Sequence, residues 1–155
     1  MMKYIFIFLT SCLIFSSCKE EEIISSNVDD PLFTCNIDGY TFSDNTPTIN
    51  INVSDMMSID LSDGTYTLSI RIYNFSGLSV NDVIPFSVPG MGIVSYNGST
   101  YSSTYNGPPF DGEIIFTTLD SEKISGNFSF KSLDVDPSVF TNIWVTDGVF
   151  ENITY

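Results

Sequence analysis

The sequence predicts an all-β domain: an antiparallel β-sandwich of about nine or ten short strands, or a small closed or partly open β-barrel. Three observations support this prediction. The 155 residues include 18 Ile, 10 Val and 14 Thr, the β-branched types that favour strands. Ala and Gln, two good helix formers, are absent, and no segment shows a sustained helical period of apolar residues. Short alternating segments also recur between turn-forming dipeptides, as is typical of sandwiches and barrels.

The first half of the domain contains the clearest strand signals. Residues 33–37 and 40–42 alternate on either side of Asp38-Gly39, a pair that favours a type I′ hairpin turn. Two short strands are expected next, at 49–53 and 57–61. Over residues 66–73 every second side chain is apolar, which predicts a long central strand with one buried face.

The second half begins less regularly and then returns to strands. Pro85 interrupts residues 80–88 and predicts an edge strand or a loop there, because proline cannot donate to a sheet ladder. Residues 90–112 are rich in Gly, Ser, Asn and Tyr and should contain two short strands around Asn97-Gly98. Further strands are expected at 113–119, 124–130, 143–145 and 149–155, with Asp147-Gly148 as a second Asp-Gly hairpin between the last two.

The N-terminus has the pattern of an export signal. Lys3 precedes an apolar run that is too short to span a bilayer and fits a signal peptide over residues 1–17. Ser16-Ser17-Cys18 resembles a bacterial lipoprotein signal, in which Cys18 becomes the lipidated N-terminus. We therefore expect an acidic tether over residues 18–31 and a single β-domain over residues 32–155.

Two alternatives to lipidation at Cys18 stay open. Cys12 lies in a sequence closer to the usual lipidation pattern but leaves a very short apolar run, and an ordinary secretory signal would carry no lipid. Behind Cys18, the residues Lys19, Glu20 and Glu21 resemble the export signal of surface-displayed Bacteroidota lipoproteins. The expected location is the outer membrane, with the domain anchored by lipid and facing outward; the periplasmic face is the alternative.

Charge and missing residue types exclude several functions. The net charge of −14 argues against nucleic acid as a partner. Without histidine there is no Ser-His-Asp triad and no His-ligated zinc. The acidic segments 60–64 and 134–136 do not fit an EF-hand, and we expect neither a metal nor a cofactor. Cys35 alternates with Phe33 and Ile37, which favours a buried thiol over a reactive one.

Three segments of the second half and the first hairpin together resemble a known family. They read DGEIIFTTLD at 111–120, ISGNFSF at 124–130 and VTDGVF at 145–150, and the hairpin covers Phe33–Phe42. This combination is similar to uncharacterised Bacteroidota lipoproteins catalogued as a domain of unknown function. The resemblance implies an anchored all-β domain and supplies no catalytic residues.

The remaining candidate for function is a binding surface. Tyr96, Tyr101, Tyr105 and Phe110 are interleaved with Ser, Gly and Asn, a mixture that binding loops use. The sequence thus favours a non-enzymatic accessory module for a glycan or protein ligand. The first alternative is a structural or envelope-shielding lipoprotein without a specific ligand. The second is a small hydrolase using paired carboxylates such as Glu113 and Glu151.

Overall fold

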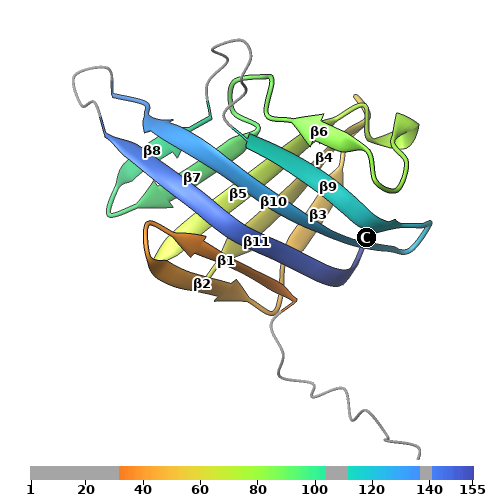
Figure 1. Ribbon diagram of the computed structural model, residues 1–155, viewed down its shortest axis with the longest axis horizontal. Coiled ribbons are helices and arrows are strands. Elements are labelled where there is room, and N and C mark those ends of the chain that lie inside the picture. The colour runs from red at the N-terminus through yellow and green to blue at the C-terminus, as the bar shows by residue number, and fades with distance from the viewer. Residues whose placement is uncertain (1–31, 104–111, 137–140) are drawn as a thin grey trace, which may run out of the picture.

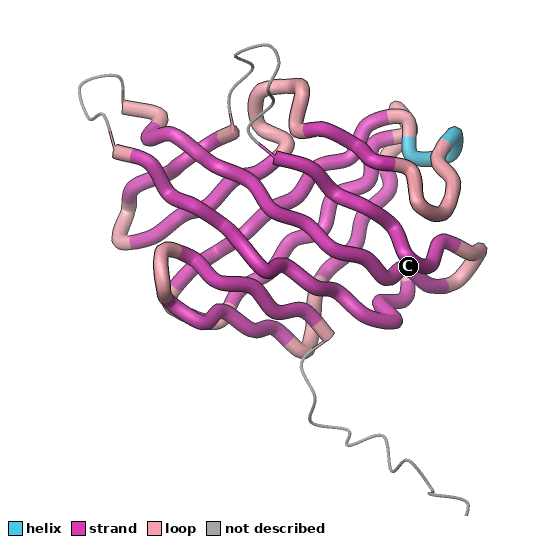
Figure 2. Tube along the Cα trace, in the orientation of Figure 1, coloured by secondary structure: helices cyan, strands magenta, loops and turns pink. Residues whose placement is uncertain are grey.

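The computed structural model describes residues 32–103, 112–136 and 141–155, which form an all-β domain (Figure 1). Eleven antiparallel strands join in one continuous, curled sheet. Apart from the 3₁₀ turn η1 (Phe75–Gly77), the described chain consists of strands and loops (Figure 2). The strands are β1 (Phe33–Ile37), β2 (Tyr40–Asp44), β3 (Thr48–Ile51), β4 (Met56–Ser62), β5 (Tyr66–Tyr73), β6 (Val83–Pro85), β7 (Gly92–Tyr96), β8 (Ser99–Ser102), β9 (Gly112–Leu119), β10 (Lys123–Asp134) and β11 (Asn142–Thr154).

The sheet curls into two layers because its central strand, β10, changes partner along its length. The first part of β10 pairs with β9, whereas its end at Leu133 and Asp134 pairs with β8. One layer is therefore β2-β1-β11-β10-β9-β6, and the other is β8-β7-β5-β4-β3. In Figure 1 the strands of the two layers cross, with β9, β10 and β11 in front of β3, β4 and β5. The predicted all-β class is confirmed, and the architecture combines features of a sandwich and of a partly open barrel.

The core lies between the two layers and is built from alternate residues of each strand. Strand β5 shows the pattern clearly, because Leu68, Ile70 and Ile72 are buried, Ser69 and Arg71 between them are partly exposed, and Thr67 and Tyr73 on either side are exposed. The front layer contributes a cluster of phenylalanine rings in edge and stacked contacts. Its fully buried members are Phe33, Phe42, Phe116 and Phe150, and Phe130 is 2% exposed.

The two layers pack closely where Gly92 of β7 meets Phe130 of β10. A Cβ atom on Gly92 would lie 2.6 Å from the ring of Phe130, so only glycine allows the ring to cover this backbone. The Phe130 ring then stacks on Phe86 at 4.9 Å between centroids. This contact closes the corner at which the sheet passes from one layer to the other.

The expected hairpin at Asp147-Gly148 is wrong. Residues 142–154 form one strand, β11, and Asp147 adopts a positive φ of 53° inside it. Two steps along β10, from Phe128 to Phe130, match three along β11, from Gly148 to Val145, which defines a β-bulge. Asp-Gly favours a positive φ angle both in a hairpin turn and in a β-bulge. Here the residues on both sides of Asp147-Gly148 pair with β10 and β1, which shows that the pair forms a bulge within one strand.

Most other local predictions are confirmed. Asp38 and Gly39 have positive φ angles and connect β1 to β2, and Asn97 and Gly98 do the same between β7 and β8. Among the described strands, β6, which contains Pro85, pairs with β9 alone and is an edge strand. The predicted signal peptide and tether (residues 1–31) lie outside the described residues. Within the described ranges, no helix has the length and apolar character needed to cross a membrane.

Candidate functional site

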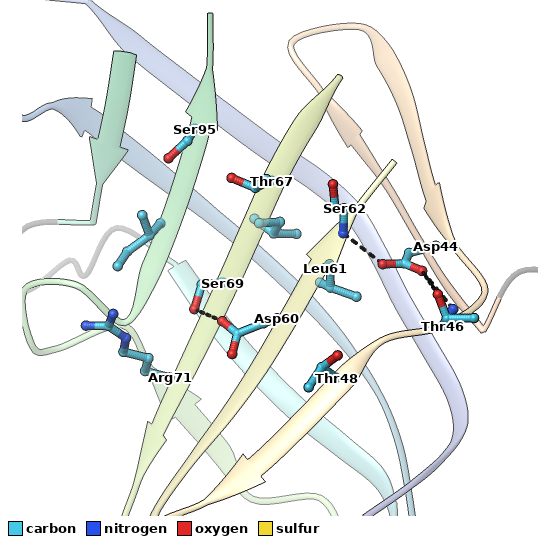
Figure 3. Close-up of a pocket in the computed structure, with 12 residues that line it drawn as sticks. Asp44, Thr46, Thr48, Asp60, Leu61, Ser62, Thr67, Ser69, Arg71 and Ser95 are labelled. Carbon is cyan, nitrogen blue, oxygen red and sulfur yellow. Dashed lines mark hydrogen bonds between the residues drawn. The ribbon is translucent and has the colours of Figure 1, made fainter. Parts of the chain in front are cut away.

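A groove with a volume of about 520 Å³ lies on the outer face of the β3–β4–β5–β7 layer (Figure 3). The strands place it there because most of their outward side chains are polar and short, Ile93 being an exception. Hydroxyl groups and two carboxylates dominate its lining, together with one arginine. Its polar residues are Asp44, Thr46, Thr48, Asp60, Ser62, Thr67, Ser69, Arg71 and Ser95.

Strand register arranges these side chains in rows across the sheet. One row runs from Thr48 on β3 to Asp60 on β4 and Ser69 on β5. A second row, two residues along, places Ser62 opposite Thr67 and Thr67 opposite Ser95. Directly opposite residues on one face have Cβ atoms about 5 Å apart. The rows therefore present closely spaced hydrogen-bonding groups to solvent.

Asp60 lies at the centre of the groove and is held by its neighbours. Its Oδ1 atom accepts a hydrogen bond from the Ser69 hydroxyl at 2.6 Å, and Oδ2 accepts one from the Ser58 hydroxyl at 3.2 Å. Figure 3 shows the Ser69 contact as a dashed line. Because a carboxylate has about four acceptor sites, Asp60 keeps free lone pairs for a ligand that donates hydrogen bonds.

Asp44 closes one end of the groove and links the two layers. It is the last residue of β2, yet its Oδ2 atom accepts a hydrogen bond from the backbone N–H of Ser62 on β4 at 2.8 Å. Its Oδ1 atom accepts from the backbone N–H and the hydroxyl of Thr46 at 2.7 and 3.2 Å. Ser62 lies beyond the start of β3, so Asp44 satisfies a sheet N–H that has no strand partner.

Arg71, the only arginine of the chain, lines the groove from β5. Its guanidinium group forms no ion pair or hydrogen bond with any described residue. No buried side-chain nitrogen of the described residues lacks a partner, so the unpaired guanidinium nitrogens contact solvent. The groove thus offers an available cation beside hydroxyl groups and a carboxylate.

A second feature lies on the inner side of the same layer, at its open end. Tyr66 stacks between Tyr96, at 4.5 Å between ring centroids, and Tyr40, at 5.0 Å. Tyr40 and Tyr96 stay 39% and 36% exposed. Burial raises the pKa of the Tyr66 hydroxyl, and the neighbouring Tyr96 and Asp38 raise it further. This tyrosine stack joins β2, β5 and β7.

The structure separates the aromatic residues that the sequence groups together. Tyr96 belongs to the tyrosine stack, whereas Tyr101 packs against the hydrophobic core from β8. Tyr105 and Phe110 lie outside the described residues. The predicted lipidation site Cys18 and the predicted export signal Lys19, Glu20 and Glu21 also lie outside them. Their roles therefore stay predictions.

The other candidate chemistry of the sequence is placed as follows. Glu113 and Glu151 are both exposed on strands of the front layer. In the described part of the chain, no three Cys, Asp or Glu side chains converge to hold a metal ion. Asp63 and Asp134 accept backbone N–H groups two residues ahead, as turn residues do. Cys35 is 4% exposed, and burial raises the pKa of its thiol to about 12.

Sequence reasoning missed the groove because its residues come from five strands, β2, β3, β4, β5 and β7. The alternation in residues 66–73 already indicates that Thr67, Ser69 and Arg71 share a solvent face. It does not indicate which strands lie beside that face. The one available signal was the single arginine among 19 acidic residues, placed on the polar side of the most regular strand.

Comparison with known proteins assigns the chain to a family. The chain belongs to the family described as domain of unknown function (DUF6252), whose model matches residues 29–154. No curated protein and no solved structure matches it. The resemblance to a domain of unknown function is thereby confirmed, whereas the Bacteroidota origin and the lipoprotein character stay predictions.

Proposed function

We propose that the protein is a lipid-anchored surface lipoprotein whose β-domain is a non-enzymatic module that binds a glycan. The groove on the outer face of β3, β4, β5 and β7 is the observation that carries the binding part of this proposal. The anchor is supported by the residues around Cys18 and by the apolar run before it.

The chemistry of the groove favours a sugar over an apolar ligand. Ser and Thr hydroxyls both donate and accept hydrogen bonds, and the Asp60 carboxylate accepts them, which matches the many hydroxyls of a saccharide. The groove is open along one side and shallow, so it suits one stretch of an extended chain. On the same outward face of β5, Tyr73 follows Arg71 by two residues and is 38% exposed, which provides an aromatic ring about 7 Å along the strand.

The proposed anchor leaves this groove accessible. Residues 18–31 can span at most about 50 Å when extended. The domain begins at β1, and Phe33 lies opposite Asp44, which closes one end of the groove. A tether of this reach lets the domain turn toward a polysaccharide at the cell surface.

The anchor is tested by changing Cys18 to Ala in bacteria that process lipoproteins. The protein with Cys18 should incorporate labelled palmitate and be cut when intact cells are treated with protease. Cys18→Ala should lose the label, whereas Cys12→Ala should keep it. Labelling that persists in Cys18→Ala would contradict the proposal, and protection from protease on intact cells would place the domain on the periplasmic side.

The groove is tested by glycan-array binding of the detergent-purified full-length protein. Asp60→Asn keeps the shape of the side chain and removes the charged acceptor, so binding should fall about ten-fold. Glu113→Gln is the matched control, because it removes an exposed carboxylate from a strand of the front layer. Equal binding by both variants, or no glycan bound by the unchanged protein, would count against a glycan site in this groove.

A further inference from the structure

We propose that Arg71 makes the groove selective for saccharides that carry a carboxylate, such as uronic acids. This inference rests on the proposed glycan-binding function and adds the class of sugar and the residue that selects it. The starting observation is that the only arginine of a chain with 19 acidic residues has no acidic partner among the described residues.

The nearest acidic side chain in the register does not neutralise Arg71. Asp60 lies opposite Ser69, so Arg71 is its diagonal neighbour, at a residue separation of about 7–8 Å. The Asp60 oxygens instead accept the hydroxyls of Ser69 and Ser58. Asp60 is therefore held by neutral donors on its own strand and the next, and the five N–H donors of Arg71 stay available.

The backbone beside Arg71 leaves its guanidinium group open. Gly90 has a positive φ of 80°, and a Cβ atom built there would lie 3.8 Å from Nη1 of Arg71 and 3.9 Å from Oγ of Ser102. Because Gly90 has no side chain, this residue adds only its backbone beside that edge of the guanidinium group. The Ser102 hydroxyl beside it donates to the carbonyl oxygen of Ser103 at 3.2 Å and does not occupy the arginine.

The arrangement matches one orientation of an acidic sugar. A guanidinium group binds a carboxylate through two parallel hydrogen bonds, which are stronger than bonds between neutral groups. With one carboxylate at Arg71, an acidic oligosaccharide that runs across the strands would bring the hydroxyls of its neighbouring sugars toward Ser69 and Asp60, which donate or accept hydrogen bonds. Asp60 would thus accept hydrogen bonds from sugar hydroxyls, and Arg71 would bind the carboxylate.

The net charge of −14 opposes an anionic ligand, but it acts mainly at long range. At 0.15 M salt, charges more than about 8 Å apart are largely screened, whereas a direct guanidinium–carboxylate contact is not. Binding is therefore measured at 0.15 M salt, which screens most of the repulsion from distant acidic residues.

The test compares each acidic saccharide with its own methyl ester, which removes the charge and keeps the sugar. The probes are oligomers of galacturonic and glucuronic acid, titrated into the detergent-purified full-length protein by calorimetry. The unchanged protein should bind at least one acid about ten-fold more tightly than its ester. Arg71→Gln should bind the acid and the ester equally, and Arg71→Lys should keep part of the preference, because it retains charge without the planar fork.

Three other outcomes would contradict the selectivity, the role of Arg71 or the glycan-binding function itself. Binding of neutral sugars or esters as tight as binding of the acids would overturn the selectivity and leave the glycan-binding function standing. A preference for the acid that survives in Arg71→Gln would show that Arg71 does not select it. If neither these probes nor any glycan on the array binds, the proposed function fails together with the selectivity.

Discussion

The two faces of β5 show how differently one strand can be used. On the inner face, Leu68, Ile70 and Ile72 are at most 1% exposed and pack between the layers. On the outer face, Ser69 and Arg71 line an open groove. The residues alternate along the same eight positions, so backbone, neighbours and local strand stability are shared. Side-chain changes on the two faces should therefore separate stability from binding.

The largest expected effect on stability comes from the inner face. Ile70 is fully buried, so Ile70→Ala should lower the free energy of unfolding by about 2–5 kcal/mol. Ser69→Ala, one residue away on the outer face, should lower it by only about 1 kcal/mol, because it removes one exposed hydrogen bond to Asp60. Urea denaturation followed by circular dichroism measures both. If the two variants lose similar stability, the separation of the faces is wrong.

The second-largest loss of stability should come from removing Asp44, which links β2 of one layer to β4 of the other. Asp44→Ala removes the acceptor of two backbone N–H groups, at Ser62 and Thr46, in a side chain that is 8% exposed. Leaving such groups without partners costs about 1–3 kcal/mol. Thermal unfolding should show the loss. An unchanged melting temperature would mean that water replaces Asp44 and that it does not tie β2 to β4.

Alkaline pH should lower the free energy of unfolding through Cys35, which lies in the core on β1. The pKa of its thiol is raised by burial to about 12 from 9.0, so the unfolded chain ionises first. The stability that comes from keeping the buried thiol neutral is fully present below pH 9 and is lost as the pH rises from about 9 toward 12. At pH 10 the loss is about 1 kcal/mol. Comparing urea denaturation at pH 7 and pH 10, Cys35→Ala should lose less stability than the unchanged protein; an equal loss would contradict the prediction.

The tyrosine stack tests whether an exposed ring serves structure or binding. Tyr96→Ala removes the ring that stacks on Tyr66 at 4.5 Å, which should cost about 0.5–1.5 kcal/mol. If the ligand binds in the groove, affinity in the glycan titration should stay within about two-fold, the spread of ordinary surface changes. A large loss of affinity with little loss of stability would instead favour the aromatic site that the sequence predicts at Tyr96.

Local signals predicted much of the fold. Asp38-Gly39, the alternation of residues 66–73 and Pro85 each act through the backbone of a few neighbouring residues, and each is confirmed. Asp147-Gly148 misled because the same positive φ serves a bulge once a long strand is paired on both sides. The groove could not be predicted because it depends on register between strands far apart in the sequence. Nothing local to Thr48 or Ser95 indicates that their strands, β3 and β7, lie on either side of β4 and β5.

The central claim is that the outer face of β3, β4, β5 and β7 binds the ligand. The most direct test is an NMR titration of the ¹⁵N-labelled protein with the acidic oligosaccharide that binds best. The account predicts that the largest amide shifts gather on these strands around Asp60, Ser69 and Arg71, and that they shrink in Arg71→Gln. Shifts that gather on β9–β11 or around Tyr40 and Tyr96, with none near Arg71, would contradict it.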